Sequence, residues 1–134
     1  MSKVIIQKVV IKNATPKEIY EGLLDSKLHC KFTGGKAEVS NKVGGAFTAW
    51  DGYITGKNIE LKKDEKIVQE WKASDWHKGT PASKLTLTFK KVSTGTEINL
   101  KQENVPKECF EDLTKGWIEF YWKPMQKYFN EKVD

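Results

Sequence analysis

The chain has 134 residues, and 23 basic residues against 18 acidic ones give it a net charge of +5. All of its basic residues are lysines, and it contains no arginine. Its 38% hydrophobic and 31% charged residues are typical of a soluble globular protein, and they exclude disordered and fibrous classes. A chain of this length is expected to fold as one domain, spanning residues 1–134.

The distribution of charge and apolar residues also excludes several kinds of partner. No apolar stretch approaches the roughly 18–20 residues that a membrane-spanning helix needs, and no secretion signal opens the chain, so we expect a cytoplasmic protein without a membrane span. The lysines are scattered, and the arginine forks that bind phosphate groups are missing, so nucleic acid is not an expected partner. Cys30 and Cys109 are expected to be reduced thiols rather than a disulfide or a metal site.

The first third of the chain predicts a strand followed by two short helices. Lys3–Lys12 is rich in β-branched residues and has strand length. Thr15–Glu18 combines an N-cap threonine, a proline at the first helical position and a glutamate that completes a capping box. Asp25-Ser26 can begin a second helix, which Gly34-Gly35 is expected to end.

The middle of the chain predicts a meander of antiparallel strands. Asp51-Gly52 is the strongest signal for a two-residue hairpin turn, because both positions of such a turn need positive φ. Another turn is expected at Ser93–Gly95. The expected strands are Lys36–Ser40, Ala46–Trp50, Tyr53–Leu61, Lys66–Ala73, Ser83–Val92 and Thr96–Gln102.

The last segment predicts one long amphipathic helix. Its apolar residues recur at intervals of three and four: Phe110, Leu113, Trp117, Phe120, Tyr121, Met125, Tyr128 and Phe129. Gly116 suggests a close approach of another group to the helix backbone. Pro124 is expected to bend the helix, because it removes one hydrogen bond and clashes with the preceding turn.

These elements predict an α+β protein in which the long helix lies against the concave face of the sheet, because only that face can bury the aromatic stripe. This is the helix-grip arrangement of START-like proteins. Several motifs then resemble, in order along the chain, the C-terminal domain of the activator of the 90-kilodalton heat-shock chaperone's ATPase. They are Phe32–Ala37, Gly44–Phe47, Asp51–Gly56, Ile67–Lys72, Leu85–Phe89, Asn104–Pro106 and Gly116–Trp122.

The resemblance implies a non-enzymatic domain that acts by binding. The partner that it implies is a heat-shock protein 90-type chaperone, on which the eukaryotic members also dock a further N-terminal domain. Similar helix-grip proteins hold lipids, sterols or polyketides between the sheet and the helix. An apolar small molecule in that position is therefore a second expected partner, and no cofactor is expected.

The aromatic residues are the candidate binding site. Ordinary core packing accounts for many of them, but their number is also typical of an apolar cavity. The expected ligand-binding residues are Phe32, Trp50, Trp71, Trp76, Phe89, Trp117, Phe120 and Tyr121. The mouth of the cavity is expected at the Trp76 loop and the Gly34-Gly35 turn.

An enzyme of the polyketide-cyclase type is the alternative interpretation. A cavity lined only by apolar side chains would count against it, whereas a buried histidine or carboxylate with a perturbed pKa beside the tryptophans would support it. His29 is next to Cys30, but neighbours on a helix point about 100° apart, so no nucleophile and base pair is expected. His77 is expected in a loop at the mouth. No catalytic residue and no metal-ligand spacing is assigned.

Overall fold

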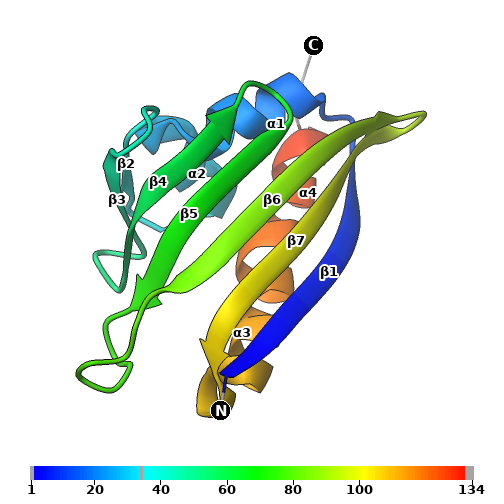
Figure 1. Ribbon diagram of the computed structural model, residues 1–134. Coiled ribbons are helices and arrows are strands. Elements are labelled where there is room, and N and C mark those ends of the chain that lie inside the picture. The colour runs from blue at the N-terminus through cyan, green and yellow to red at the C-terminus, as the bar shows by residue number, and fades with distance from the viewer. Residues whose placement is uncertain (1, 34, 132–134) are drawn as a thin grey trace.

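The computed structural model describes residues 2–33 and 35–131 (Figure 1). Gly34, expected to end the second helix, lies outside the described residues. The strands are β1 (Ser2–Lys12), β2 (Glu38–Val39), β3 (Ala46–Ala49), β4 (Ile54–Lys62), β5 (Lys66–Ala73), β6 (Ser83–Val92) and β7 (Gly95–Pro106). The helices are α1 (Pro16–Leu23), α2 (Ser26–Thr33), α3 (Phe110–Trp117) and α4 (Lys123–Glu131), with a 3-10 turn at Lys107–Cys109 and a π-helical turn at Ile118–Trp122.

The described strands form one antiparallel sheet of seven strands in the order β1-β7-β6-β5-β4-β3-β2. The meander from β2 to β7 follows the chain, and β1 is added beside β7. The last helices, α3 and α4, cross one face of this sheet (Figure 1). The expected α+β helix-grip fold is therefore confirmed, because the strand, the two short helices, the meander and the long helix occur in the expected order.

Side-chain hydrogen bonds to the backbone fix the starts of both short helices. The Thr15 hydroxyl accepts the Glu18 backbone N–H at 3.1 Å, and the Glu18 carboxylate accepts the Thr15 N–H at 3.0 Å, so the expected capping box is present. The Asp25 carboxylate accepts the Leu28 N–H at 3.0 Å at the start of α2. Both signals were sufficient because they depend on residues only three positions apart.

The turn between β3 and β4 is longer than expected. Ala49 pairs with Ile54, so four residues rather than two connect the strands. Asp51 and Gly52 have the expected positive φ of 57° and 88°, but Trp50 adopts a φ of 55° as well. This third left-handed residue extends the turn. It leaves Trp50 and Tyr53 at the end of the sheet, on either side of the turn.

The long helix is interrupted before Pro124. In the π-helical turn the Lys123 N–H donates to the Ile118 carbonyl, five residues back, so one extra residue is accommodated. The extra residue rotates the apolar face. Trp122, which the expected stripe omits, is only 5% exposed, whereas Phe120 is 57% exposed.

Gly116 does not mark a close approach, so that expectation is wrong. Outside the backbone of its own helix, a β-carbon at Gly116 would meet only the Phe120 ring, at 3.7 Å, which is an ordinary contact. Gly116 instead faces a cavity.

Candidate ligand pocket

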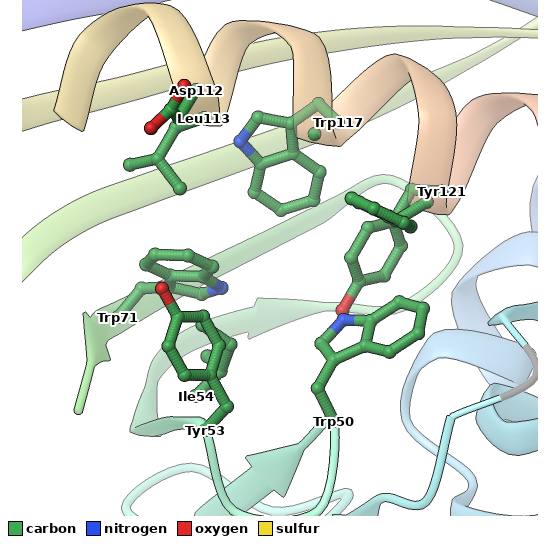
Figure 2. Close-up of a pocket in the computed structure, with 10 residues that line it drawn as sticks. Trp50, Tyr53, Ile54, Trp71, Asp112, Leu113, Trp117 and Tyr121 are labelled. Atoms are coloured by element: carbon green, nitrogen blue, oxygen red, sulfur yellow. The ribbon is translucent and has the colours of Figure 1, made fainter. Parts of the chain in front are cut away.

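A pocket of about 340 Å³ opens between α3, the π-helical turn, the β3–β4 turn and β5. Figure 2 shows its side chains arranged around a common space. The lining residues are Trp50, Tyr53, Ile54, Trp71, Asp112, Leu113, Gly116, Trp117, Phe120 and Tyr121. Most of the lining is therefore aromatic or aliphatic, which is typical of a small-molecule site.

The aromatic walls contact one another at normal ring distances. Trp117 lies 5.9 Å from Trp71 and 4.8 Å from Tyr121, measured between ring centroids. On the other side of the pocket, Trp50 lies 5.5 Å from Phe120 and 6.0 Å from Tyr121. Such ring pairs contribute a favourable free energy in addition to that of burying their apolar area, so we expect the rings to hold their positions without a ligand.

A buried polar chain holds Trp117 in place. Its indole N–H donates to the Gln102 side-chain oxygen at 2.9 Å, and the Gln102 amide nitrogen donates to the Ser83 hydroxyl at 2.9 Å. The Ser83 hydroxyl donates to the Trp71 carbonyl at 2.6 Å. All three side chains are buried. This series of hydrogen bonds therefore links Trp117, on the helix side of the pocket, to β5, which carries Trp71 on the opposite side.

Sequence reasoning missed Gln102 and Ser83. Gln102 continues the alternation of Ile98 and Leu100, which point to the buried face of β7. A polar residue at an inward position of a strand needs a partner, and that signal would have identified it.

Carboxylates lie at the mouth of the pocket. Asp112 lines it directly, and the Tyr53 hydroxyl donates to the Asp75 carboxylate at 2.9 Å. Burial, this hydrogen bond and the charge of Asp75 raise the pKa of Tyr53 to about 12, and Asp112 adds to the effect. Tyr53 therefore stays neutral in the physiological pH range.

Tyr121 separates the pocket from His29. The Tyr121 hydroxyl accepts a hydrogen bond from the Trp50 indole and lies 3.4 Å from His29 Nε2. Burial lowers the pKa of His29 to about 4 and raises the pKa of Tyr121. His29 lines a separate interior space of about 30 Å³ behind Tyr121, rather than the larger pocket. At neutral pH both groups are uncharged.

Cys30 does not share the surroundings of His29. Its sulfur accepts the Ala37 backbone N–H at 3.2 Å, which agrees with the expectation that the two neighbours point apart. Both cysteines are free thiols and partly buried, as expected. His77 is exposed in its loop and does not line the pocket.

The structure brings together five of the eight expected ligand-binding residues, because Trp50, Trp71, Trp117, Phe120 and Tyr121 all line the pocket. Sequence reasoning missed the other five lining residues. Leu113 lies four residues before Trp117, and Gly116 lies four residues before Phe120, so their position on the helix could have identified them.

The remaining three expected residues lie elsewhere. Phe32 packs against Tyr128 and Phe129, with ring centroids 5.0 Å and 5.3 Å apart. Phe89 packs against Tyr20 at 6.3 Å. Trp76 is buried and lies 6.0 Å from Trp71, behind the pocket wall. These three are core residues, and none of them is among the lining residues of the pocket.

The mouth of the pocket differs in part from the expected one. Its exposed lining residues are Tyr53, Asp112 and Phe120, so it lies between the β3–β4 turn and the helix. Of the Trp76 loop, Asp75 reaches the mouth through its hydrogen bond with Tyr53. Gly35 lies against the Trp50 ring, and Gly34 is outside the described residues.

Within residues 2–33 and 35–131, no group of three or more His, Cys, Asp or Glu side chains could hold a metal ion. In the same part of the chain, no helix has both the length and the apolar character that crossing a membrane requires.

Comparison with known proteins gives a consistent family. A family model described as "Activator of Hsp90 ATPase homolog 1-like protein" matches residues 13–130. The chain is 27% identical over 125 residues to "Activator of 90 kDa heat shock protein ATPase homolog 1" of Homo sapiens, covering 91% of this chain and 37% of that protein. It is 31% identical over 104 residues to the homolog of Dictyostelium discoideum, covering 77% of this chain and 27% of that protein.

The chain thus spans about a third of the length of these curated relatives. Among solved structures, the crystal structure of an HSP90 activator from Plasmodium falciparum is similar with a TM-score of 0.83 and 27% identity. That similarity covers 97% of this chain and 96% of the other.

Proposed function

The chain belongs to the family of Activator of Hsp90 ATPase homolog 1-like proteins, and we propose that it is a non-enzymatic binding domain whose pocket holds an apolar small molecule. The observation that carries this proposal is the aromatic pocket of about 340 Å³. Ligand pockets typically measure roughly 300–1,000 Å³ and are lined mainly by apolar and aromatic side chains. We also propose that the protein acts in the cytoplasm and that residues 1–134 form a single domain.

The walls of the pocket favour binding because they are already built. Gln102 fixes the Trp117 ring, and Tyr121 accepts a hydrogen bond from Trp50. A ligand therefore does not have to order these side chains, which lowers the entropic cost of binding. Apolar area that the ligand shares with the rings is removed from water, and this supplies the main favourable free energy.

The polar groups near the pocket support binding rather than catalysis. A general base must reach the proton that it abstracts, and His29 lies behind the Tyr121 ring. The polyketide-cyclase-like alternative rests on this His29–Tyr121 pair, since a buried histidine with a lowered pKa stands beside the aromatic wall. That alternative requires Tyr121 to move aside, so that a substrate in the pocket reaches His29.

A titration with a neutral apolar probe tests the pocket. We expect n-butylbenzene to shift the tryptophan fluorescence, because three tryptophans line the cavity. Gly116→Leu should abolish the shift, since the new side chain fills the pocket from a helical position that has room for it. Lys115→Leu is the matched control on the neighbouring exposed position and should bind normally. Equal binding by both variants, or no binding by the unmodified protein, would contradict the proposal.

We also propose a heat-shock protein 90-type chaperone as the protein partner, because the human and Dictyostelium relatives are named activators of that chaperone's ATPase. The domain should raise the ATPase turnover of the chaperone from its own cell. Unchanged turnover at a saturating concentration of the domain would refute this partner. Repeating the assay with Gly116→Leu separates the two activities, because stimulation through the outer surface does not need an open pocket.

A further inference from the structure

The pocket combines aromatic rings with a carboxylate. Six of its ten lining residues are aromatic, namely Trp50, Tyr53, Trp71, Trp117, Phe120 and Tyr121, and Asp112 is the one charged residue among them. An aromatic ring carries negative charge on its faces, and a cation held within roughly 6 Å of several ring centroids is attracted to them. Rings that surround one space, as in Figure 2, are the usual way in which proteins bind substituted ammonium ions.

The charge around the mouth also favours a cation. Asp112 lies at the edge of the pocket. Asp75 is held near the same edge by its hydrogen bond with Tyr53, which also lines the pocket. Burial raises the pKa of Cys109, and the carboxylates of Glu108, Asp75 and Asp112 raise it further, so these negative charges act on one region.

This region differs from the rest of the molecule. The protein carries a net charge of +5 and 23 lysines, yet none of the described residues that line the pocket is a lysine. An anionic ligand would find no positive partner within the lining, and it would approach two carboxylates. A cationic ligand would find complementary charge at the mouth and complementary ring faces inside.

The volume of the pocket also limits the kind of cation that would fill it. A volume of about 340 Å³ is much larger than a bare ammonium ion requires. The carbon-lined part of the cavity, with Ile54 and Leu113, suits an apolar body attached to the charged group.

Building on the proposed binding function, we infer that the pocket selects an organic cation, specifically a substituted ammonium ion carrying an apolar group, over neutral and anionic molecules of the same shape. The ammonium group lies among the aromatic rings near Asp112, and the apolar group occupies the deeper part between the helix and β5. Burial of the apolar part supplies affinity, and the rings and the carboxylate supply selectivity.

Two probes of the same shape test this inference. Benzyltrimethylammonium and its neutral carbon analogue neopentylbenzene differ only in the charge at the quaternary centre. We expect the cation to bind about tenfold more tightly at low salt, as measured by tryptophan fluorescence or calorimetry. An anionic probe, benzenesulfonate, should bind more weakly than either. Tighter binding of the neutral or the anionic probe than of the cation would overturn the inference.

Two variants separate the contributions of charge and of ring faces. Asp112→Asn should weaken binding of the cation about threefold, and by more than it changes binding of the neutral probe, because the carboxylate is exposed and partly screened. Phe120→Leu keeps an apolar side chain but removes one ring face, so it should also weaken the cation more than the neutral probe. If both variants bind the cation as well as the unmodified protein does, the inference fails.

A matched control guards against general effects of charge. Glu111→Gln removes the same charge from the neighbouring position, which does not line the pocket, and should bind both probes normally. The outcomes also distinguish this inference from the function on which it rests. Equal binding of the cation and the neutral analogue leaves the apolar pocket intact and refutes the cation preference. Failure of all probes to bind refutes the apolar pocket itself.

Discussion

The two ends of the long helix use similar residues for different purposes. At the α4 end, Met125 and Phe129 are buried, and Phe32 of α2 packs against Phe129. At the α3 end, Trp117 and Phe120 line a pocket instead. The difference lies in what covers the helix, because α2 contacts α4, whereas the β3–β4 turn, Ile54 and Trp71 face the α3 end across the pocket. Figure 1 shows α2 and α4 at the same end of the sheet. Aromatic content alone therefore does not locate a binding site.

The largest expected effect comes from breaking the packed end. Phe32→Ala should lower the free energy of unfolding by about 3–5 kcal/mol, because the buried ring contacts Tyr128 and Phe129 and its removal leaves a cavity. Binding of n-butylbenzene by the folded fraction should not change. Urea denaturation measures the loss, and Phe120→Ala at the open end is the control, with a loss below about 1 kcal/mol. Comparable losses at both ends would show that the open end is also packed.

Acid should lower the free energy of unfolding through His29, which lies beside Tyr121. Burial lowers the pKa of His29 to about 4, below its ordinary value of 6.5, so the unfolded chain binds this proton more readily. The stability from a neutral His29 is complete above about pH 6.5 and decreases as the pH falls toward 4, by about 3 kcal/mol in total. His29→Gln should remove that part of the pH dependence, as measured by urea denaturation at several pH values.

The control for this prediction is the other histidine. His77 is exposed, so His77→Gln changes a histidine without changing the buried one. If His29→Gln and the unmodified protein lose stability in parallel between pH 6.5 and pH 4, His29 is not buried in its neutral form.

The same substitution, glycine to alanine, should have different effects at the two ends of the helix. Gly22 in α1 lies against the Phe32 ring, and an added methyl group would collide with a side chain that has no room to move. Gly22→Ala should therefore lower the free energy of unfolding by about 1–3 kcal/mol, although alanine is the better helix former. Unchanged or increased stability would show that Phe32 can shift.

Gly116→Ala, at the open end, should have the opposite sign. The added methyl group meets only the Phe120 ring at 3.7 Å, so the helix preference of alanine should raise stability by about 0.5–1 kcal/mol. The same methyl group enters the pocket, so binding of n-butylbenzene should weaken. Thermal denaturation and a fluorescence titration on one sample measure both changes, and a loss of stability would contradict the assignment of Gly116 to the pocket.

Much of the fold could be predicted because its signals are local or periodic. The capping box at Thr15 involves four consecutive residues, and the alternation in β5 and β6 directly marks their buried faces. The length of the β3–β4 turn could not be predicted, since it depends on Trp50 adopting a positive φ. The π-helical turn likewise moved Trp122 into the core and Phe120 out of it, which a regular helical period does not show.

The site was predicted less completely than the fold. Tryptophans on the helix and on β5 could be assigned to a shared space, but the choice between cavity and core depends on which other elements cover them. Phe32 and Phe89 were therefore grouped with Trp71, although each packs against its own partner. The inward position of Gln102 on β7 signals that it needs a polar partner, but its partners Trp117 and Ser83 lie 15 and 19 residues away, so no local pattern identifies them.

Nuclear Overhauser contacts between bound benzyltrimethylammonium and the five tryptophan indoles show whether the ligand binds at the α3 end. We expect contacts to Trp50, Trp71 and Trp117, which line the pocket, and none to Trp76 or Trp122, which do not. Contacts confined to Trp76 or Trp122, or the absence of contacts to any indole at saturation, would contradict it.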